Sequence, residues 1–126
     1  MSRTGISEQI HVADYLRAQF FDTEIVWTAI NPRPYHASKA DIGNQKKMGL
    51  NAGWPDYIIL RPNLPPVFLE VKSGDKPHRS KSQKDFMAFA SRLGAVTFIV
   101  RTPEDVEDAL ISVGMITKPS FAKNKC

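Results

Sequence analysis

Two acidic residues and a lysine stand in a part of the sequence that is otherwise typical of β-structure. Asp56 begins the run 56–61, while Glu70 and Lys72 belong to the run 67–72. Alternate residues of a β-strand face the same side, so Glu70 and Lys72 share the face opposite to the apolar residues of their run. Taken alone, such a pair is most often a solvent-exposed ion pair, which stabilises a protein weakly.

A hairpin between the two runs would bring the three side chains together. The five residues between the runs include three prolines and are too few for a helical crossover, so we expect an antiparallel pair. Pairing the inner ends of the runs places Arg61 opposite Val67. In that register Asp56 lies opposite Lys72 and diagonal to Glu70, with Cβ atoms about 5 and 7 Å apart. A slip by one residue would send Asp56 to the other face.

Two carboxylates at this separation repel each other unless a cation or a proton compensates their charge. Mg²⁺ prefers carboxylate and carbonyl oxygens, and it usually keeps several waters and a substrate phosphate in its shell. The residues therefore predict a Mg²⁺ site that accepts a phosphodiester. Gly53 and Pro55 lead into this site, because Pro55 restricts the turn and Gly53 lets backbone approach closely. The alternative is a plain junction of loop and strand, with Asp56 as a turn residue.

Two further polar residues are candidates for the same site. Gln83 lies on the inward face of a helix expected over about 80–93, from which it could reach the carboxylates. Glu8 shares a face with Val12 in a helix expected over about 8–20. Both have ordinary alternatives, because Gln is a generic helix former and acidic residues favour helix N-termini. The residues expected to face inward on the second helix are Phe86, Phe89, Ala90 and Leu93.

Basic residues flank the predicted acidic site on both sides in the sequence. The stretch 31–53 has little apolar periodicity, and we expect it to be a basic loop. Basic side chains beside a phosphate site bind the nucleic-acid backbone without reading its sequence, although solubility is the alternative at a net charge of +4. The candidate nucleic-acid-binding residues are Arg33, Lys39, Lys46, Lys47, Lys76, Arg79, Lys81 and Lys84.

The remaining elements complete a small α/β protein. The runs 24–30 and 95–100 predict strands, and the segment 102–113 has the N-cap and proline of a last helix. The order α-β-β-β-α-β-α indicates a mixed β-sheet flanked by helices. The 126 residues predict one domain, with its core over about 7–113 and a flexible basic tail over 115–126.

Composition and motifs exclude several classes. Hydrophobic residues make up 42% and charged residues 24% of the chain, which is typical of a globular protein and excludes wholesale disorder. The one cysteine, Cys126, excludes an internal disulfide and a cysteine-based zinc site. Neither a signal peptide nor an apolar run of about 18 residues is present, so we expect a soluble intracellular protein. The three histidines lack metal-ligand spacing, and nucleotide-binding and serine-hydrolase motifs are missing.

The order of motifs resembles a known nuclease superfamily. The chain resembles the PD-(D/E)xK nucleases, most closely the VRR-NUC (virus-type replication–repair nuclease) family of bacteria and phages. The resemblance rests on three motifs in order, which are Gly53-Trp54-Pro55-Asp56, Glu70-Val71-Lys72 and Gln83. The resemblance extends from the first helix through Gly94. It implies a restriction-endonuclease-like αβββαβ core and a Mg²⁺- or Mn²⁺-dependent endonuclease that hydrolyses DNA phosphodiesters.

The resemblance also implies a role for each matched residue. Asp56, Glu70 and the carbonyl of Val71 would hold the metal. Lys72 would orient the attacking water or stabilise charge on the pentacoordinate phosphate. Gln83 would support the site, and Glu8 matches an acidic residue of the family's first helix. The implied catalytic set is Asp56, Glu70, Lys72, Gln83 and Glu8.

Partners and setting follow from the same resemblance. Stand-alone members of the family resemble archaeal Holliday junction resolvases and tend to be homodimers that act on branched DNA. This implies a homodimer acting on junction DNA, in repair or recombination, in the cytoplasm of a bacterial or phage-infected cell. One alternative is a non-catalytic nucleic-acid-binding domain that retains the nuclease fold, and another is an interaction protein without DNA affinity.

Overall fold

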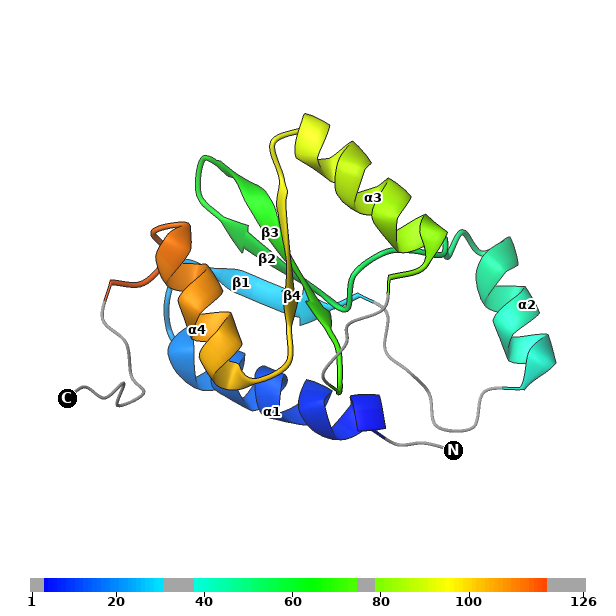
Figure 1. Cartoon of the computed structure of the whole chain (residues 1–126), viewed down its shortest axis with the longest axis horizontal. Helices are drawn as coiled ribbons and strands as arrows, with labels where there is room; N and C mark the ends of the chain where they lie inside the picture. Colours follow the sequence, from blue (N-terminus) through cyan, green and yellow to red (C-terminus); the bar gives the residue numbers. More distant parts are fainter. Residues whose placement is uncertain (1–3, 31–37, 75–78, 118–126) are drawn as a thin grey trace.

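The computed structural model describes residues 4–30, 38–74 and 79–117, which form a sheet with helices on both faces (Figure 1). The predicted order of elements is confirmed, and one helix is added to it. The helices are α1 (Thr4–Gln19), α2 (Lys39–Lys47), α3 (Lys81–Arg92) and α4 (Pro103–Ser112), and the strands are β1 (Val26–Ala29), β2 (Tyr57–Arg61), β3 (Leu64–Val71) and β4 (Val96–Val100).

The sheet is mixed, as predicted, and its spatial order is β1-β2-β3-β4. β1 pairs with β2 and β2 with β3 in antiparallel fashion, whereas β3 and β4 run parallel. A parallel pair requires a crossover connection, and α3 supplies it between β3 and β4. The ends of β2 and β3 that carry the predicted site therefore lie beside the segment that enters α3.

The register of the predicted hairpin was wrong by two residues. Ile59, rather than Arg61, lies opposite Val67. The chain reverses in a two-residue turn in which Asn63 has a φ of 61°, and β3 begins at Leu64, inside the segment expected to be a loop. A shift of the register between Ile59 and Arg61 then accommodates the extra residues of β3. Because the error is an even number of residues over Tyr57–Ile59, the side chains of this part of the hairpin, and those of Asp56 and Glu70 next to it, keep their predicted faces.

One face of the sheet carries the main core. Helices α1 and α4 pack against this face, on the side of β3 that carries Leu69. They contribute Val12 and Leu16 from α1 and Val106 and Leu110 from α4. All five of these side chains are fully buried. The two helices contact each other across this face, and α3 lies apart from them in Figure 1. Met115 and Ile116 also pack against this core, and residues 118–126 lie outside the described chain.

The other face of the sheet is covered by α3 and by aromatic rings. Phe68 of β3 points to this face and packs edge-on against Phe86 of α3, with ring centroids 5.2 Å apart. Trp54, from the segment before β2, packs on both rings. These contacts hold the segment that contains Trp54 and Asp56 against α3.

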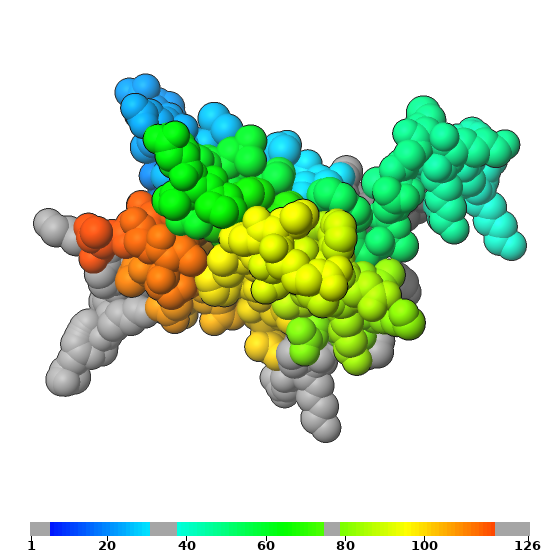
Figure 2. Space-filling view, turned by 90° about the horizontal axis from the view of Figure 1, so that it is seen from above, coloured from blue at the N-terminus to red at the C-terminus, as the bar shows by residue number. Residues whose placement is uncertain are grey.

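The expectation that 31–53 is a loop was partly wrong, because α2 occupies its middle part. Ser38 caps α2 in a capping box with Asp41, in which each side chain accepts a hydrogen bond from the other residue's backbone N–H. None of the helix's residues is buried. Both views show α2 standing away from the sheet (Figures 1 and 2). Residues 31–37 lie outside the described chain.

None of the helices in the described parts of the chain has the length and apolar character required to cross a membrane.

Candidate active site

Asp56 and Glu70 come together at the ends of β2 and β3. Asp56 lies one residue before the Tyr57–Leu69 pair, and its backbone N–H donates to the carbonyl of Leu69 over 3.0 Å. Continuing this register places Asp56 opposite Glu70, rather than opposite Lys72 as predicted. Both carboxylates are buried, with 2% and 4% of their residue surfaces exposed. The predicted convergence on one face of the hairpin is therefore present, with the two acids closer in register than expected.

The carboxylate of Asp56 is held by the backbone of the neighbouring strand. Its Oδ2 accepts a hydrogen bond from the backbone N–H of Val71 over 2.8 Å. The Asp56 carbonyl accepts from the backbone N–H of Ile30 over 2.8 Å, which ties the residue to the end of β1. The first bond fixes the Asp56 carboxylate against β3, and the second fixes its backbone beside the end of β1.

Gln83 joins Glu70 to Lys72 through its side-chain amide. Its Nε2 donates to Glu70 Oε2 over 2.9 Å, and its Oε1 accepts from Lys72 Nζ over 3.2 Å. Lys72 Nζ also lies 3.5 Å from Glu70 Oε2. The three side chains form a closed triangle, which supports the predicted position of Gln83 over the carboxylates.

The start of α3 explains how Gln83 reaches the sheet. Ser80 caps the helix, its Oγ accepting from the Gln83 backbone N–H over 3.2 Å, while the Gln83 Oε1 accepts from the Ser80 backbone N–H over 3.0 Å. Gly53 brings the segment before Asp56 close to this helix start. A Cβ at Gly53 would lie 2.4 Å from the carbonyl oxygen of Ser82, and the residue has a φ of 94°. Only glycine fits both requirements without strain.

Glu8 lies beside Lys72, on α1. The two residues line a hollow of about 370 Å³ together with His11 and Arg101. Glu8 Oε1 is buried and has no hydrogen-bond partner among the described residues. The inward orientation of Glu8 expected from the sequence is consistent with this burial.

The donor set fits a hard divalent cation. Asp56 and Glu70 are buried oxygen donors at paired positions on neighbouring strands, and Lys72 Nζ lies 3.5 Å from Glu70 Oε2. In the described parts of the chain, no three His, Cys, Asp or Glu side chains lie close enough to hold an ion between them. Glu8 therefore does not join Asp56 and Glu70 as a third carboxylate ligand in this structure.

Tyr57, next to Asp56, shows the electrostatic character of this region. Its hydroxyl donates to the carbonyl of Gln9 over 3.0 Å. Burial, and then the negative charge of Asp56, raise the pKa of Tyr57 above its ordinary value of 10.0, while Arg17 acts in the opposite direction.

The predicted basic residues divide between two helices. Lys39, Lys46 and Lys47 are exposed on α2, and Arg79, Lys81 and Lys84 are exposed at the start of α3. Lys81 forms a 2.8 Å ion pair with Asp85, and this hydrogen bond raises the pKa of Lys81. Arg33 and Lys76 lie outside the described residues.

The sequence indicated Ser80 or Ser82 as the cap of α3, but it did not reveal the link from Ser80 to the site or the place of Arg101. Ser80 positions Gln83 through the capping box, and the spacing Ser80-x-x-Gln83 is a signal that could have revealed this. Arg101 lies beside the hollow shared by Glu8 and Lys72, although it is 29 residues from Lys72 in the sequence. No local pattern indicates its place, because β4 brings it there by pairing with β3.

The comparisons with known proteins agree with this architecture. No protein-family model and no curated protein matches the chain. A solved structure described as a "VRR_NUC domain protein" superposes with a TM-score of 0.63, covering 89% of this chain and 88% of that one at 20% sequence identity. The chain has the fold of a VRR_NUC domain. The superposition confirms the αβββαβ arrangement, and in this VRR_NUC fold Asp56, Glu70, Lys72 and Gln83 lie together at one end of the sheet.

Proposed function

We propose that this protein is a metal-dependent DNA endonuclease of the VRR-NUC family. The observation that carries the proposal is the buried pair of Asp56 and Glu70, with Gln83 hydrogen-bonded to both Glu70 and Lys72. The likeness in fold to a VRR_NUC domain protein supports it. Buried carboxylates are costly unless they are compensated, and a site for a divalent ion is an arrangement in which their burial is useful.

Asp56, Glu70 and the carbonyl of Val71 would hold Mg²⁺ or Mn²⁺. When bound, the ion would lower the pKa of a water molecule and neutralise charge on the scissile phosphate. The Val71 N–H holds one oxygen of Asp56, and the amide of Gln83 holds one oxygen of Glu70. Both carboxylates are therefore orientated before any ligand arrives, which lowers the cost of ordering them.

Lys72 would act on the phosphodiester itself. Its ammonium group lies at the edge of the carboxylate pair, held by Gln83 Oε1 at 3.2 Å. From this position it would orient the attacking water or stabilise the negative charge that develops on the phosphate. Glu8, which lines the hollow next to Lys72, would contact the same region through its buried Oε1.

We propose branched DNA, such as a Holliday junction, as the substrate and a homodimer as the active form. The basic start of α3 supports a polyanionic substrate, because α3 carries Gln83 at the acidic site. The exposed lysines of α2 add positive charge to the part of the chain that precedes Asp56. A twofold-symmetric pair of sites suits a symmetric four-way junction.

The test of the proposed site is DNA cleavage with a matched charge variant. Purified protein is incubated with DNA in Mg²⁺, in Mn²⁺ and in EDTA. We expect cleavage only with a divalent ion, and a loss of roughly 100-fold or more in Asp56→Asn. Asp14→Asn is the control, since Asp14 is exposed on α1 and pairs only with Arg17 among the contacts described. Cleavage in EDTA, or equal cleavage by Asp56→Asn, would reject the site.

A second experiment tests the substrate and the assembly. Four-way junction, flap and linear duplex of matched length are compared, and the mass in solution is measured by light scattering. Preference for the junction and the mass of a dimer are the expected results. Tight, salt-sensitive binding without cleavage under any metal would instead identify a non-catalytic nucleic-acid-binding domain.

A further inference from the structure

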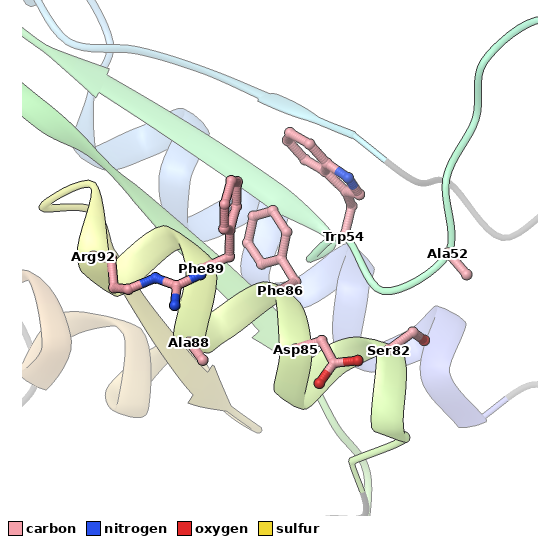
Figure 3. Close-up of a pocket in the computed structure, with 8 residues that line it drawn as sticks. All are labelled: Ala52, Trp54, Ser82, Asp85, Phe86, Ala88, Phe89 and Arg92. Carbon is pink, nitrogen blue, oxygen red and sulfur yellow. The ribbon is translucent and has the colours of Figure 1, made fainter.

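A second pocket lies on the α3 face of the sheet, adjoining the candidate active site. It has a volume of about 570 Å³ and lies between the segment before β2 and one side of α3. Figure 3 shows Trp54 on one side, Phe86 and Phe89 in the middle, and Arg92 beneath Phe89. Ser82 and Asp85 lie at the opposite end of the helix from Arg92, near Ala52. The pocket is therefore lined by both aromatic rings and polar side chains.

The rings of this pocket are fixed yet accessible. Trp54 and Phe86 pack with ring centroids 4.6 Å apart, and both rest on Phe68, which is buried. Trp54 is nevertheless 38% exposed and Phe89 is 55% exposed. Phe89 and Leu93 were both expected to face inward on this helix, and their exposure shows that this expectation was wrong for these two residues. Arg92 places its guanidinium 5.5 Å from the centroid of the Phe89 ring.

We propose that this pocket binds an unpaired nucleobase of the DNA strand that enters the candidate active site. The inference rests on the proposed function and adds one feature of its branched substrate, namely a base unpaired at the branch point, next to the cleaved bond. Nucleobases stack on exposed aromatic rings regardless of their identity, and arginine adds a cation–π contribution and a contact for phosphate. Trp54, Phe89 and Arg92 supply these groups.

The position of the pocket supports a nucleic-acid ligand. Trp54 is two residues from Asp56, and Ser82 is the neighbour of Gln83. A strand with its phosphate at the carboxylates would therefore lie next to the end of the pocket that Trp54 and Ser82 line. Aromatic platforms beside a charged groove are the usual means of holding single strands.

Charge favours DNA over a second copy of this chain as the occupant. The described residues from Arg79 to Arg92 include four basic residues and one acidic residue. The pocket itself is lined by one residue of each sign, Asp85 and Arg92, so this excess belongs to α3 and the residues just before it. A second copy docking along α3 would bring these like charges together, which opposes association. The phosphates of a DNA strand complement the same charges.

The first test measures binding without cleavage. Fluorescence anisotropy in EDTA compares a labelled oligothymidine with a blunt hairpin duplex. We expect Phe89→Ala and Arg92→Ala to weaken binding of the oligothymidine about tenfold while changing duplex binding less than about twofold. Phe21→Ala is a matched control, because Phe21 is 80% exposed and lies beyond the end of α1. Leu93→Ala is the second control, since Leu93 lines the adjoining apolar pocket but not this one.

The second test leaves the pocket intact. In a Trp27→Phe background Trp54 is the one tryptophan of the chain, and a base stacked on it quenches its fluorescence. Oligothymidine should quench this emission and duplex should not. This measurement holds even where an alanine variant folds poorly.

Three results would overturn the inference. Wild-type affinity of Phe89→Ala for oligothymidine, with Trp54 emission unchanged by DNA, would show that no base enters the pocket. A halved solution mass of Phe89→Ala would show that a second copy covers this face. Absence of any DNA binding by the wild-type protein would reject both the inference and the proposed function. In the first two cases the wild-type protein would still cleave DNA with a divalent metal, so only the inference about the pocket would fail. In the third case there would be no such cleavage, and the proposed function would fail as well.

Discussion

The side-chain amide of Gln83 takes part both in the start of α3 and in the acidic site. Its oxygen accepts from the Ser80 backbone and from Lys72, and its nitrogen donates to Glu70. An amide can do this because it carries donors and an acceptor together, whereas a glutamate at this position would offer acceptors only. The residue therefore couples the geometry of the carboxylates to the position of the helix.

We expect Gln83→Ala to reduce DNA cleavage by about 10- to 100-fold, because Glu70 and Lys72 lose their common partner. The free energy of unfolding should fall by only about 1 kcal/mol, since one half of a helix cap is lost. Cleavage rates and urea unfolding provide the two measurements.

Ser80→Ala separates these two roles of Gln83. The variant loses the cap oxygen, yet the Gln83 amide keeps its bonds to Glu70 and Lys72. Stability should fall by about as much as in Gln83→Ala, while most of the cleavage activity is retained. Equal losses of activity in the two variants would show that Gln83 acts only as a helix cap.

At the scale of elements, α2 differs from the other helices. It is formed by its capping box and by local propensity, and it buries none of its residues. Its lysines are exposed and make no contribution to the core, and in the proposed function they would contact DNA. Binding strength and fold stability should therefore respond independently to changes in this helix.

The double variant Lys46→Ala/Lys47→Ala tests this independence. We expect weaker DNA binding, a slope of log Kd against log salt reduced by about 1 to 2, and an unchanged free energy of unfolding. Arg17→Ala should leave the salt slope unchanged, because Arg17 lies near the far end of α1, paired with Asp14. An unchanged slope in the double variant would show that α2 does not contact DNA.

The elements were predicted well wherever burial produces a periodic pattern. Strands 56–61 and 67–72 and the helix near 80–93 were found from their apolar residues, and Asp56 and Glu70 were assigned to the correct face. The helix α2 was missed because it has no apolar stripe, although the Ser38-x-x-Asp41 spacing was a usable signal. Alternation sets the face of a strand but not its register, which here depends on the turn at Asn63.

At the scale of the whole molecule, the two faces of the sheet have different composition. The face under α1 and α4 is packed with aliphatic side chains together with Phe20 and Tyr57, whereas the α3 face holds the Phe68–Phe86 ring pair and the carboxylate site. β3 belongs to both faces, since Val67, Leu69 and Val71 point one way and Phe68 and Glu70 the other. The backbone that carries Glu70 is therefore held by the core residues on the opposite face of β3, which limits the movement of the site.

Leu110→Ala tests whether the two faces unfold together. Leu110 is fully buried in α4, so its truncation should lower the free energy of unfolding by roughly 2 to 5 kcal/mol. We expect urea unfolding followed by tryptophan fluorescence and by far-UV circular dichroism to shift to the same midpoint, because β3 links both faces. Leu93→Ala, at a position that is 70% exposed, should change stability by less than about 0.5 kcal/mol. Separate midpoints for the two probes would contradict a single cooperative unit.

The isolation of α2 also bears on how such a protein can be altered. A helix without buried side chains places few demands on its sequence beyond its caps, so its charges can be reversed, multiplied or removed by exchange of a short cassette. Such exchanges would alter no residue of the hydrophobic core. The charge of α2 can therefore be changed, by engineering or by divergence between relatives, with little expected effect on the free energy of unfolding.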